Sequence, residues 1–212
     1  ELATYSPDLL KKEFGVYGVQ LWYHANGVDE SNVHVPYKPK SKGLGNSQVL
    51  PRDYVKQQEI ELVLSEMAEQ VAIRLRAIRK KTTTVSISIG YSRFEESTSF
   101  RGQMKIEPTN QTEELQKYVI SLFRKKYNGG AVRSISVFYS SFVDENITML
   151  SLFDDPEEIL KKERLQTAID AIRSQFGFTT LQKANSLTSA SRSIARSKLV
   201  GGHSAGGLDG LK

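Results

Sequence analysis

Alternating hydrophobic and polar positions predict two consecutive β-strands between Thr82 and Ile106. Apolar side chains occupy every second position, which are Val85, Ile87 and Ile89 in the first strand and Phe100, Met104 and Ile106 in the second. Alternate side chains of a strand point to opposite faces, so one face of this pair is buried and the other meets water. We expect the pair to form the centre of a larger sheet.

The water-facing side of the same pair combines small and cationic groups. Its residues are Ser86, Ser88, Arg101, Gln103 and Lys105. A surface of low relief flanked by cations suits a polyanion better than a small molecule. A solvated sheet face that binds nothing explains the same pattern, and from the strands alone both interpretations stay open.

Two longer segments show the three-and-four spacing of amphipathic helices. The apolar positions are Ile60, Val63, Leu64, Met67, Val71, Leu75 and Ile78 in the range 54–80, and Leu115, Tyr118, Val119, Leu122 and Phe123 in the range 111–127. Each set forms one stripe that must pack against a core. Pro51-Arg52-Asp53 is expected to open the first helix.

Two further strands, 46–50 and 132–143, complete the predicted domain. In the second of these, Ile135, Val137 and Tyr139 alternate with Ser134, Ser136 and Phe138, and Arg133 lies at its entry. The order is strand, helix, strand, strand, helix, strand. Both helical stripes must then be buried on one face of a four-stranded sheet, which leaves the other face open. The sequence predicts an α+β domain at 46–143, of roughly 100 residues, enough for an independent core.

Residues 1–33 predict a helical hairpin in front of this domain. The first helix is expected to begin at Pro7, and Asn26-Gly27 suits the end of the second. The expected core of the hairpin consists of Phe14, Leu21 and Trp22.

Residues 34–45 predict a basic linker between the hairpin and the domain. Lys38, Lys40 and Lys42 alternate with other residues among prolines and glycines. Alternate side chains of an extended chain lie on one side at intervals of roughly 6–7 Å, which is near the spacing of phosphates along one nucleic-acid strand. The segment is therefore either a tether that follows a phosphate backbone or a linker that lysines keep soluble.

The sequence after residue 143 predicts a peptide, a helix and a tail. The segment 144–156 leaves the domain and carries the apolar cluster Met149-Leu150-Ser151-Leu152-Phe153. A helix is expected over 157–178, and from residue 179 to residue 212 a serine-, arginine- and glycine-rich composition predicts a mobile tail.

Charge narrows the range of partners, and no pattern indicates catalysis. The net charge is +5, and the range 38–143 holds 18 lysines and arginines against 10 acidic residues. This excess of positive charge is compatible with a nucleic-acid partner.

There is no cysteine, and His24, His34 and His203 lie far apart in different elements, so metal-ligand spacing is absent. No apolar run is long enough to cross a bilayer, so no membrane partner is expected. We expect no cofactor on this chain.

Taken together, these segments resemble the C-terminal half of a Y-family (UmuC/ImpB/MucB-like) translesion DNA polymerase of the Gram-positive and phage type. The phrases Phe14-Gly15-Val16-Tyr17-Gly18, Leu21-Trp22 and Ala25-Asn26-Gly27 are similar to the end of that family's thumb. The phrase Pro39-Lys40-Ser41-Lys42-Gly43 is similar to its basic linker, and the six-element domain resembles its little finger. Residues 149–153 resemble the Gln-Leu-Ser-Leu-Phe peptide that binds the bacterial sliding clamp, with Met149 in place of Gln.

The resemblance implies that the little finger holds primer–template DNA through phosphates. The implied DNA-binding residues are Lys38, Lys40, Lys42, Ser47, Arg52, Ser86, Ser88, Arg101, Gln103, Lys105, Arg133, Ser134 and Ser136. The serines are expected to keep the surface low, so that backbone N–H groups approach phosphates. The implied clamp-binding residues are Met149, Leu150, Ser151, Leu152 and Phe153.

The resemblance also implies where the chemistry of such a polymerase takes place. The family's catalytic carboxylates and their Mg²⁺ belong to a palm that this sequence does not include, so no catalytic residue is expected here. The implied setting is DNA repair and the SOS response in the cytoplasm at the nucleoid, by a monomer that contacts DNA and the clamp. The alternative is a stand-alone nucleic-acid-binding accessory module without polymerase activity.

Overall fold

The computed structural model describes residues 1–29, 31–32, 34, 43–96, 99–146, 155–200 and 203–204. The chain divides into two compact units, Glu1–Lys40 and Ser41–Lys212. Each unit is described by itself.

The first unit is a small helical hairpin, as the sequence predicts. It consists of a short 3-10 turn, η1 (Leu2–Thr4), followed by α1 (Pro7–Phe14) and α2 (Val16–Ala25). The two helices meet where Gly18 lies against Leu10, because a Cβ on Gly18 would lie 2.1 Å from the Leu10 carbonyl oxygen. The predicted core is wrong in part, since Phe14 is 60% and Leu21 47% exposed in the structure.

The second unit is built on an open four-stranded antiparallel sheet. Its strands are β1 (Gly43–Tyr54), β2 (Lys80–Tyr91), β3 (Phe100–Thr109) and β4 (Val132–Asp144), in the spatial order β1-β4-β2-β3. The predicted fold class and the order of elements are confirmed. The expectation that both strands of the 82–106 pair lie at the centre is wrong, because β3 is an edge strand.

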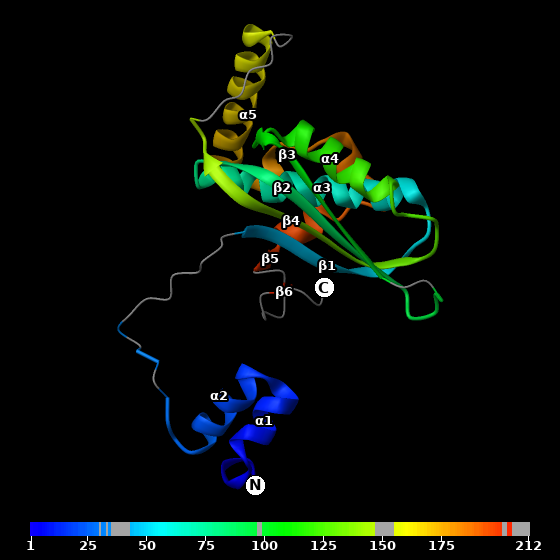
Figure 1. The fold of residues 1–212 in the computed structure, drawn as a ribbon. Helices are drawn as coiled ribbons and strands as arrows, with labels where there is room; N and C mark the ends of the chain where they lie inside the picture. The colour runs from blue at the N-terminus through cyan, green and yellow to red at the C-terminus, as the bar shows by residue number, and fades with distance from the viewer. Residues whose placement is uncertain are drawn as a thin grey trace. The chain divides into compact units, whose positions relative to one another are not determined.

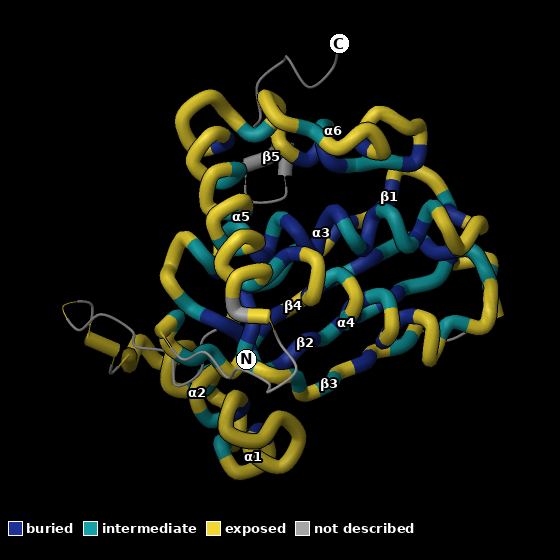
Figure 2. Tube along the Cα trace, turned by 90° about the horizontal axis from the view of Figure 1, so that it is seen from above, coloured by how far each residue is buried: buried dark blue, intermediate teal, exposed yellow. Residues whose placement is uncertain are grey.

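Two helices, α3 (Gln57–Ala77) and α4 (Thr112–Arg124), cover one face of this sheet (Figure 1). Buried residues gather along α3 and the strands beneath it, as the dark blue segments of Figure 2 show. The predicted helical stripes are buried, with Ile60, Val63, Leu64, Met67, Val71, Leu75, Leu115, Val119 and Phe123 all at 0% exposure. Burial of such a stripe contributes roughly 2 kcal/mol per large side chain.

The start of α3 differs from the prediction because β1 is longer than expected. Pro51 and Arg52 lie within β1, where the register to β4 shifts between Val49 and Tyr54. Tyr54 still pairs with Val132 and is fully buried, so the chain becomes helical only after it. At the other end, Arg79 has a φ of 53°, which ends the helix and leaves Ile78 48% exposed.

The chain after the sheet continues through α5 (Pro156–Phe176), η2 (Phe178–Thr180), η3 (Ala184–Leu187) and α6 (Ser193–Ser197). Asp155 caps α5 by accepting a 2.9 Å hydrogen bond from the Glu157 N–H. A short β5 (Leu199–Val200) pairs with β6 (His203–Ser204).

The segment 179–198, which belongs to the tail predicted to be mobile, packs against the domain in the structure. The Tyr54 hydroxyl donates a 3.0 Å hydrogen bond to the Ala190 carbonyl, and Arg196 donates a 2.9 Å hydrogen bond to Gln48. These contacts reach across more than a hundred residues of sequence, which composition alone does not reveal. Within the described residues, no helix is long and apolar enough to cross a membrane.

Candidate nucleic-acid interface

The open face of the sheet brings together the small polar residues that the sequence singles out. The register aligns Ser47 of β1, Ser136 of β4, Ser88 of β2 and Arg101 of β3 in one row across all four strands. The neighbouring rows are Gly45, Phe138, Ser86 and Gln103 on one side, and Val49, Ser134 and Gly90 on the other. This face lies opposite α3 and α4 (Figure 1).

The middle of the open face is low because its side chains are small and close together. The Ser47 and Ser136 hydroxyls are hydrogen-bonded at 2.8 Å. Gly90 packs under Ser134, since a Cβ on Gly90 would lie 2.2 Å from the Ser134 Oγ. A surface this low lets a broad polymer lie along it, and its hydroxyls offer hydrogen-bond donors to phosphate oxygens.

Backbone N–H groups beneath the central serines take part in the sheet. Ser86, Ser88 and Ser136 each have paired neighbours on both sides, so the ladder uses their N–H groups. This differs from the expectation that serines on β2 and β4 allow the backbone beneath them to approach phosphates. In the structure, these serines offer their hydroxyls.

Two exposed cations stand at the β3 edge of this face. Arg101 and Lys105 alternate with Gly102 and Met104, whose positions face the core. The Arg101 backbone carbonyl accepts a 2.7 Å hydrogen bond from the Lys126 ammonium, which brings a third cation to the same edge. Positive charge therefore borders the serine rows on one side.

Two other predicted cations, Arg52 and Arg133, are engaged with acidic partners. The Arg52 guanidinium donates a 3.0 Å hydrogen bond to Glu59 and stacks 4.3 Å from the centre of the Tyr54 ring. The Arg133 guanidinium lies 3.6 Å from the Asp53 carboxylate. These pairs reduce the positive charge that the two arginines offer to a ligand.

The remaining predicted site residues lie outside the described residues. They are Lys38, Lys40 and Lys42 of the linker and the peptide Met149–Phe153. Their roles therefore stay predictions.

Sequence reasoning missed one residue of the open face, Phe138. It lies between Ser86 and Gly45 in the register and is 46% exposed. Its ring covers β1, because a Cβ on Gly45 would lie 2.3 Å from Phe138 Cδ2 and a Cβ on Gly43 would lie 2.4 Å from Phe138 Cζ. The signal was present in the sequence, since Phe138 alternates with the buried Val137 and Tyr139.

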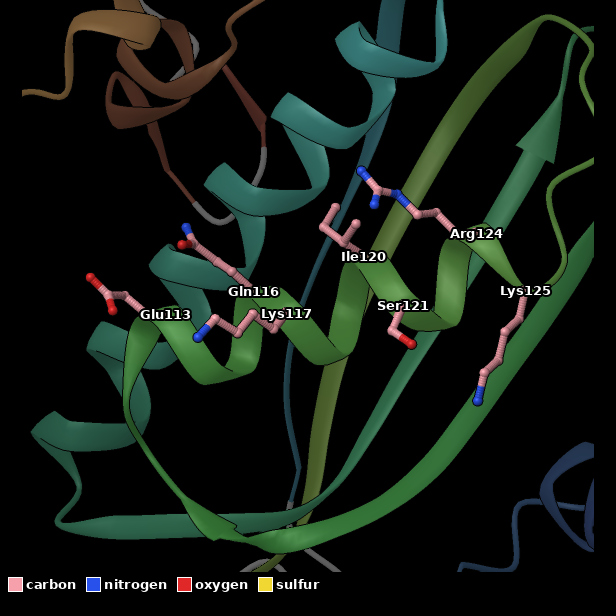
Figure 3. Close-up of a pocket in the computed structure, with 7 residues that line it drawn as sticks. All are labelled: Glu113, Gln116, Lys117, Ile120, Ser121, Arg124 and Lys125. Carbon is pink, nitrogen blue, oxygen red and sulfur yellow. The ribbon is translucent and has the colours of Figure 1, made fainter. Parts of the chain in front are cut away.

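The other side of the domain offers a different kind of surface. A shallow depression on the outer side of α4 is lined by side chains of mixed charge, among them Glu113, Lys117 and Lys125 (Figure 3). Arg124 at its border donates hydrogen bonds of 2.6 and 2.7 Å to Glu61, and these bonds lower the pKa of the Glu61 carboxyl. Among the described residues, no group of three or more His, Cys, Asp or Glu side chains could hold a metal ion.

Comparisons with known proteins relate this chain to one protein family, whose members include DNA repair proteins and DNA polymerases. Residues 41–152 match the impB/mucB/samB family C-terminal domain. UvrX of Bacillus subtilis (strain 168) is 39% identical over 204 residues, which are 96% of this chain and 49% of that protein. DNA polymerase IV 2 of the same organism is 38% identical over 204 residues, with 95% and 49% covered. The DNA repair protein homolog YobH, also of that organism, is 42% identical over 130 residues, with 61% and 60% covered. The chain spans about half the length of the first two relatives.

Proposed function

The chain belongs to the impB/mucB/samB family of Y-family polymerases, whose C-terminal domain it contains, and on this premise we propose that it grips primer–template DNA for a translesion polymerase. The observation that carries the proposal is the open face of the sheet, with its serine rows and the cations at the β3 edge. Within the described part of the second unit, α3 and α4 cover the opposite face, which leaves the polar side for a ligand. The relatives named as DNA polymerase and DNA repair proteins support DNA as that ligand.

The proposed grip acts on phosphates. The Arg101 guanidinium can donate two parallel hydrogen bonds to one phosphate, and the Lys105 ammonium acts as a point charge. Serine hydroxyls on the low middle of the sheet complete the contact by donating to phosphate oxygens. Such contacts carry no information about base sequence, which suits an enzyme that must move along any template.

The test measures binding of a primer–template duplex by fluorescence anisotropy over a series of salt concentrations. Each phosphate contact releases counterions, so affinity must fall as salt rises. Arg101→Glu is expected to weaken binding for all sequences alike and to reduce the slope of log affinity against log salt by about 1. Affinity that does not change with salt would overturn the proposal.

A matched control separates the site from the net charge of the chain. Lys161→Glu makes the same change from cation to anion at an exposed position of α5, which belongs to the helical side of the domain. We expect binding of Lys161→Glu to resemble that of the unmodified chain. If both variants lose affinity equally, the attraction is general and the open face is not the site.

We propose further that the peptide Met149–Phe153 binds the bacterial sliding clamp. The support is the pattern of apolar residues at Leu150, Leu152 and Phe153, each of which contributes roughly 2–3 kcal/mol when buried in a partner. Replacing Leu152 and Phe153 by alanine is expected to abolish co-purification with the purified clamp while leaving DNA affinity unchanged. Clamp binding that survives both substitutions would remove the peptide from the proposal.

These two activities define the setting that we propose for the chain. It contributes DNA and clamp contacts to lesion bypass during DNA repair, including the SOS response, in the cytoplasm at the nucleoid.

A further inference from the structure

Phe138 places an aromatic ring within a face whose other side chains are mostly small or polar. Its neighbours across the register are Gly45 on β1 and Ser86 on β2, and the next row begins with Ser47 and Ser136. The residue is 46% exposed, which is a large apolar area on a surface proposed to hold DNA. The phosphate contacts described above make no use of it.

Two glycines hold the Phe138 ring against β1. Ring atoms lie 2.4 Å from the Cβ position of Gly43 and 2.3 Å from that of Gly45, so the ring occupies the space that two side chains would otherwise fill. An aromatic ring above glycines of an edge strand shields their backbone. That structural role uses the side of the ring that faces β1 and requires only an apolar group of similar size. It does not explain why the other side of the ring stays exposed.

The surroundings leave the exposed side of the ring accessible to a flat ligand. Ser86, Ser136 and Gly45 are too short to rise above an aromatic ring that lies beside them. The Phe138 ring lies over β1, which is three strand spacings from β3, or roughly 14 Å. The cations at the β3 edge are therefore about two nucleotides from a base stacked on the ring.

We infer that Phe138 is a stacking platform for an unpaired nucleobase of single-stranded DNA, with the adjoining phosphates directed toward Arg101 and Lys105. The inference rests on the proposed DNA-binding function of the same face. An unpaired base presents its face to an aromatic ring, whereas inside a duplex that face is covered by the neighbouring base pairs. Phenylalanine has no hydrogen-bonding group, so the platform accepts any base.

The test is a double-mutant cycle between the ring and the base. The full chain is titrated by fluorescence anisotropy with a duplex that carries an oligothymidine overhang, with the same duplex whose overhang is abasic, and with the blunt duplex. Phe138→Leu keeps an apolar cover over Gly43 and Gly45 but removes the aromatic face. Phe176→Leu is the matched control, because it makes the same substitution at an exposed ring (62%) at the end of α5, on the helical side of the domain.

We expect Phe138→Leu to lose roughly 5-fold or more in affinity for the thymidine overhang. The same substitution should leave affinity for the abasic overhang and for the blunt duplex within about twofold, since stacking requires a base. Phe176→Leu should bind all three ligands like the unmodified chain. Circular dichroism and thermal unfolding of Phe138→Leu verify that the sheet is intact.

Two results would overturn the inference. One is an equal loss for thymidine and abasic overhangs, which would assign Phe138 to the fold of the sheet or to sugar–phosphate contact. The other is a loss confined to the blunt duplex, which would place the ring against paired DNA. The proposed grip is judged separately by Arg101→Glu: if that variant weakens binding while Phe138→Leu does not, only the stacking platform fails.

Discussion

Glu66 on α3 is a buried carboxylate that binds a distant part of the chain. It is 7% exposed, and it accepts hydrogen bonds from the Ser191 hydroxyl and, at 2.8 Å, from the Arg192 backbone N–H. Burial raises the pKa of Glu66 above its ordinary value of 4.5, although the hydrogen bonds oppose this change. Glu66, which does not belong to the apolar stripe of α3, thus holds the segment around residue 191 in place.

The raised pKa of Glu66 predicts how stability depends on pH. Because the folded-state pKa lies above the unfolded one, the stabilising contribution is complete below about pH 4.5 and is lost as the pH rises through the folded-state pKa. Glu66→Gln does not titrate. We expect its free energy of unfolding, relative to the unmodified chain, to rise as the pH is raised from about 4.5 toward neutrality.

Urea unfolding over a pH series measures this difference. A relative stability of Glu66→Gln that falls with rising pH would show that the hydrogen bonds outweigh burial.

At the scale of elements, α5 and the segment 178–198 are attached to α3 by two arginines, of which Arg173 is buried and Arg76 is half-buried. The Arg173 guanidinium donates to Glu69 at 2.9 Å and to the Leu181 carbonyl at 2.9 and 3.1 Å. The Arg76 guanidinium forms two hydrogen bonds with Asp170, of 2.5 and 3.1 Å. Arg76, one of the cations near the end of α3, thus anchors another helix.

Removing Arg173 should loosen this attachment without opening the sheet. Glu69 and Arg173 are 11% and 7% exposed at their side chains, and removal of one partner of a buried pair costs about 3 kcal/mol when the other is left unpaired. The cost here is smaller, because the Lys183 ammonium lies 3.3 Å from the Glu69 carboxylate. Arg173→Met is expected to accelerate amide hydrogen exchange in residues 178–198, while β2 and β4 stay protected. Arg164→Met on the exposed side of α5 is the control. Unchanged exchange in 178–198 would show that other contacts suffice.

At the scale of the whole molecule, the core of the second unit is complete within that unit. The buried cluster contains residues of β1, α3, β2, α4 and β4, together with Ala190 from the C-terminal segment. A domain of this size buries enough apolar surface to fold alone.

The second unit is therefore expected to fold without the first. A chain of residues 41–212 should unfold in one cooperative transition and should keep salt-dependent DNA binding that Arg101→Glu weakens. Calorimetry and the anisotropy titration measure both properties. A non-cooperative transition would show that the unit needs residues 1–40.

The sequence predicts those features of the fold and the site that depend on residues close together in the chain. Alternation and three-and-four spacing located β2, β3, β4, α3 and α4, because these patterns record which side of an element is buried. The same alternation placed Ser86, Ser88, Ser136 and Arg101 on one face, since side chains of a strand have only two directions. The extra residues of β1 were misassigned, because Pro51 suits both a helix start and a bulge on an edge strand.

The sequence by itself determined the fold class, the elements and the composition of the open face, since each follows from local periodicity and the burial it implies. Only the tertiary structure decided which strands are central, that Phe138 lies over Gly43 and Gly45, and that residues 179–198 pack on α3. It also decided that Arg52 and Arg133 have acidic partners whereas Arg101 and Lys105 border the serine rows. These features depend on contacts between residues far apart in the chain, and polar pairs such as Glu66 with Ser191 have no period that a sequence displays.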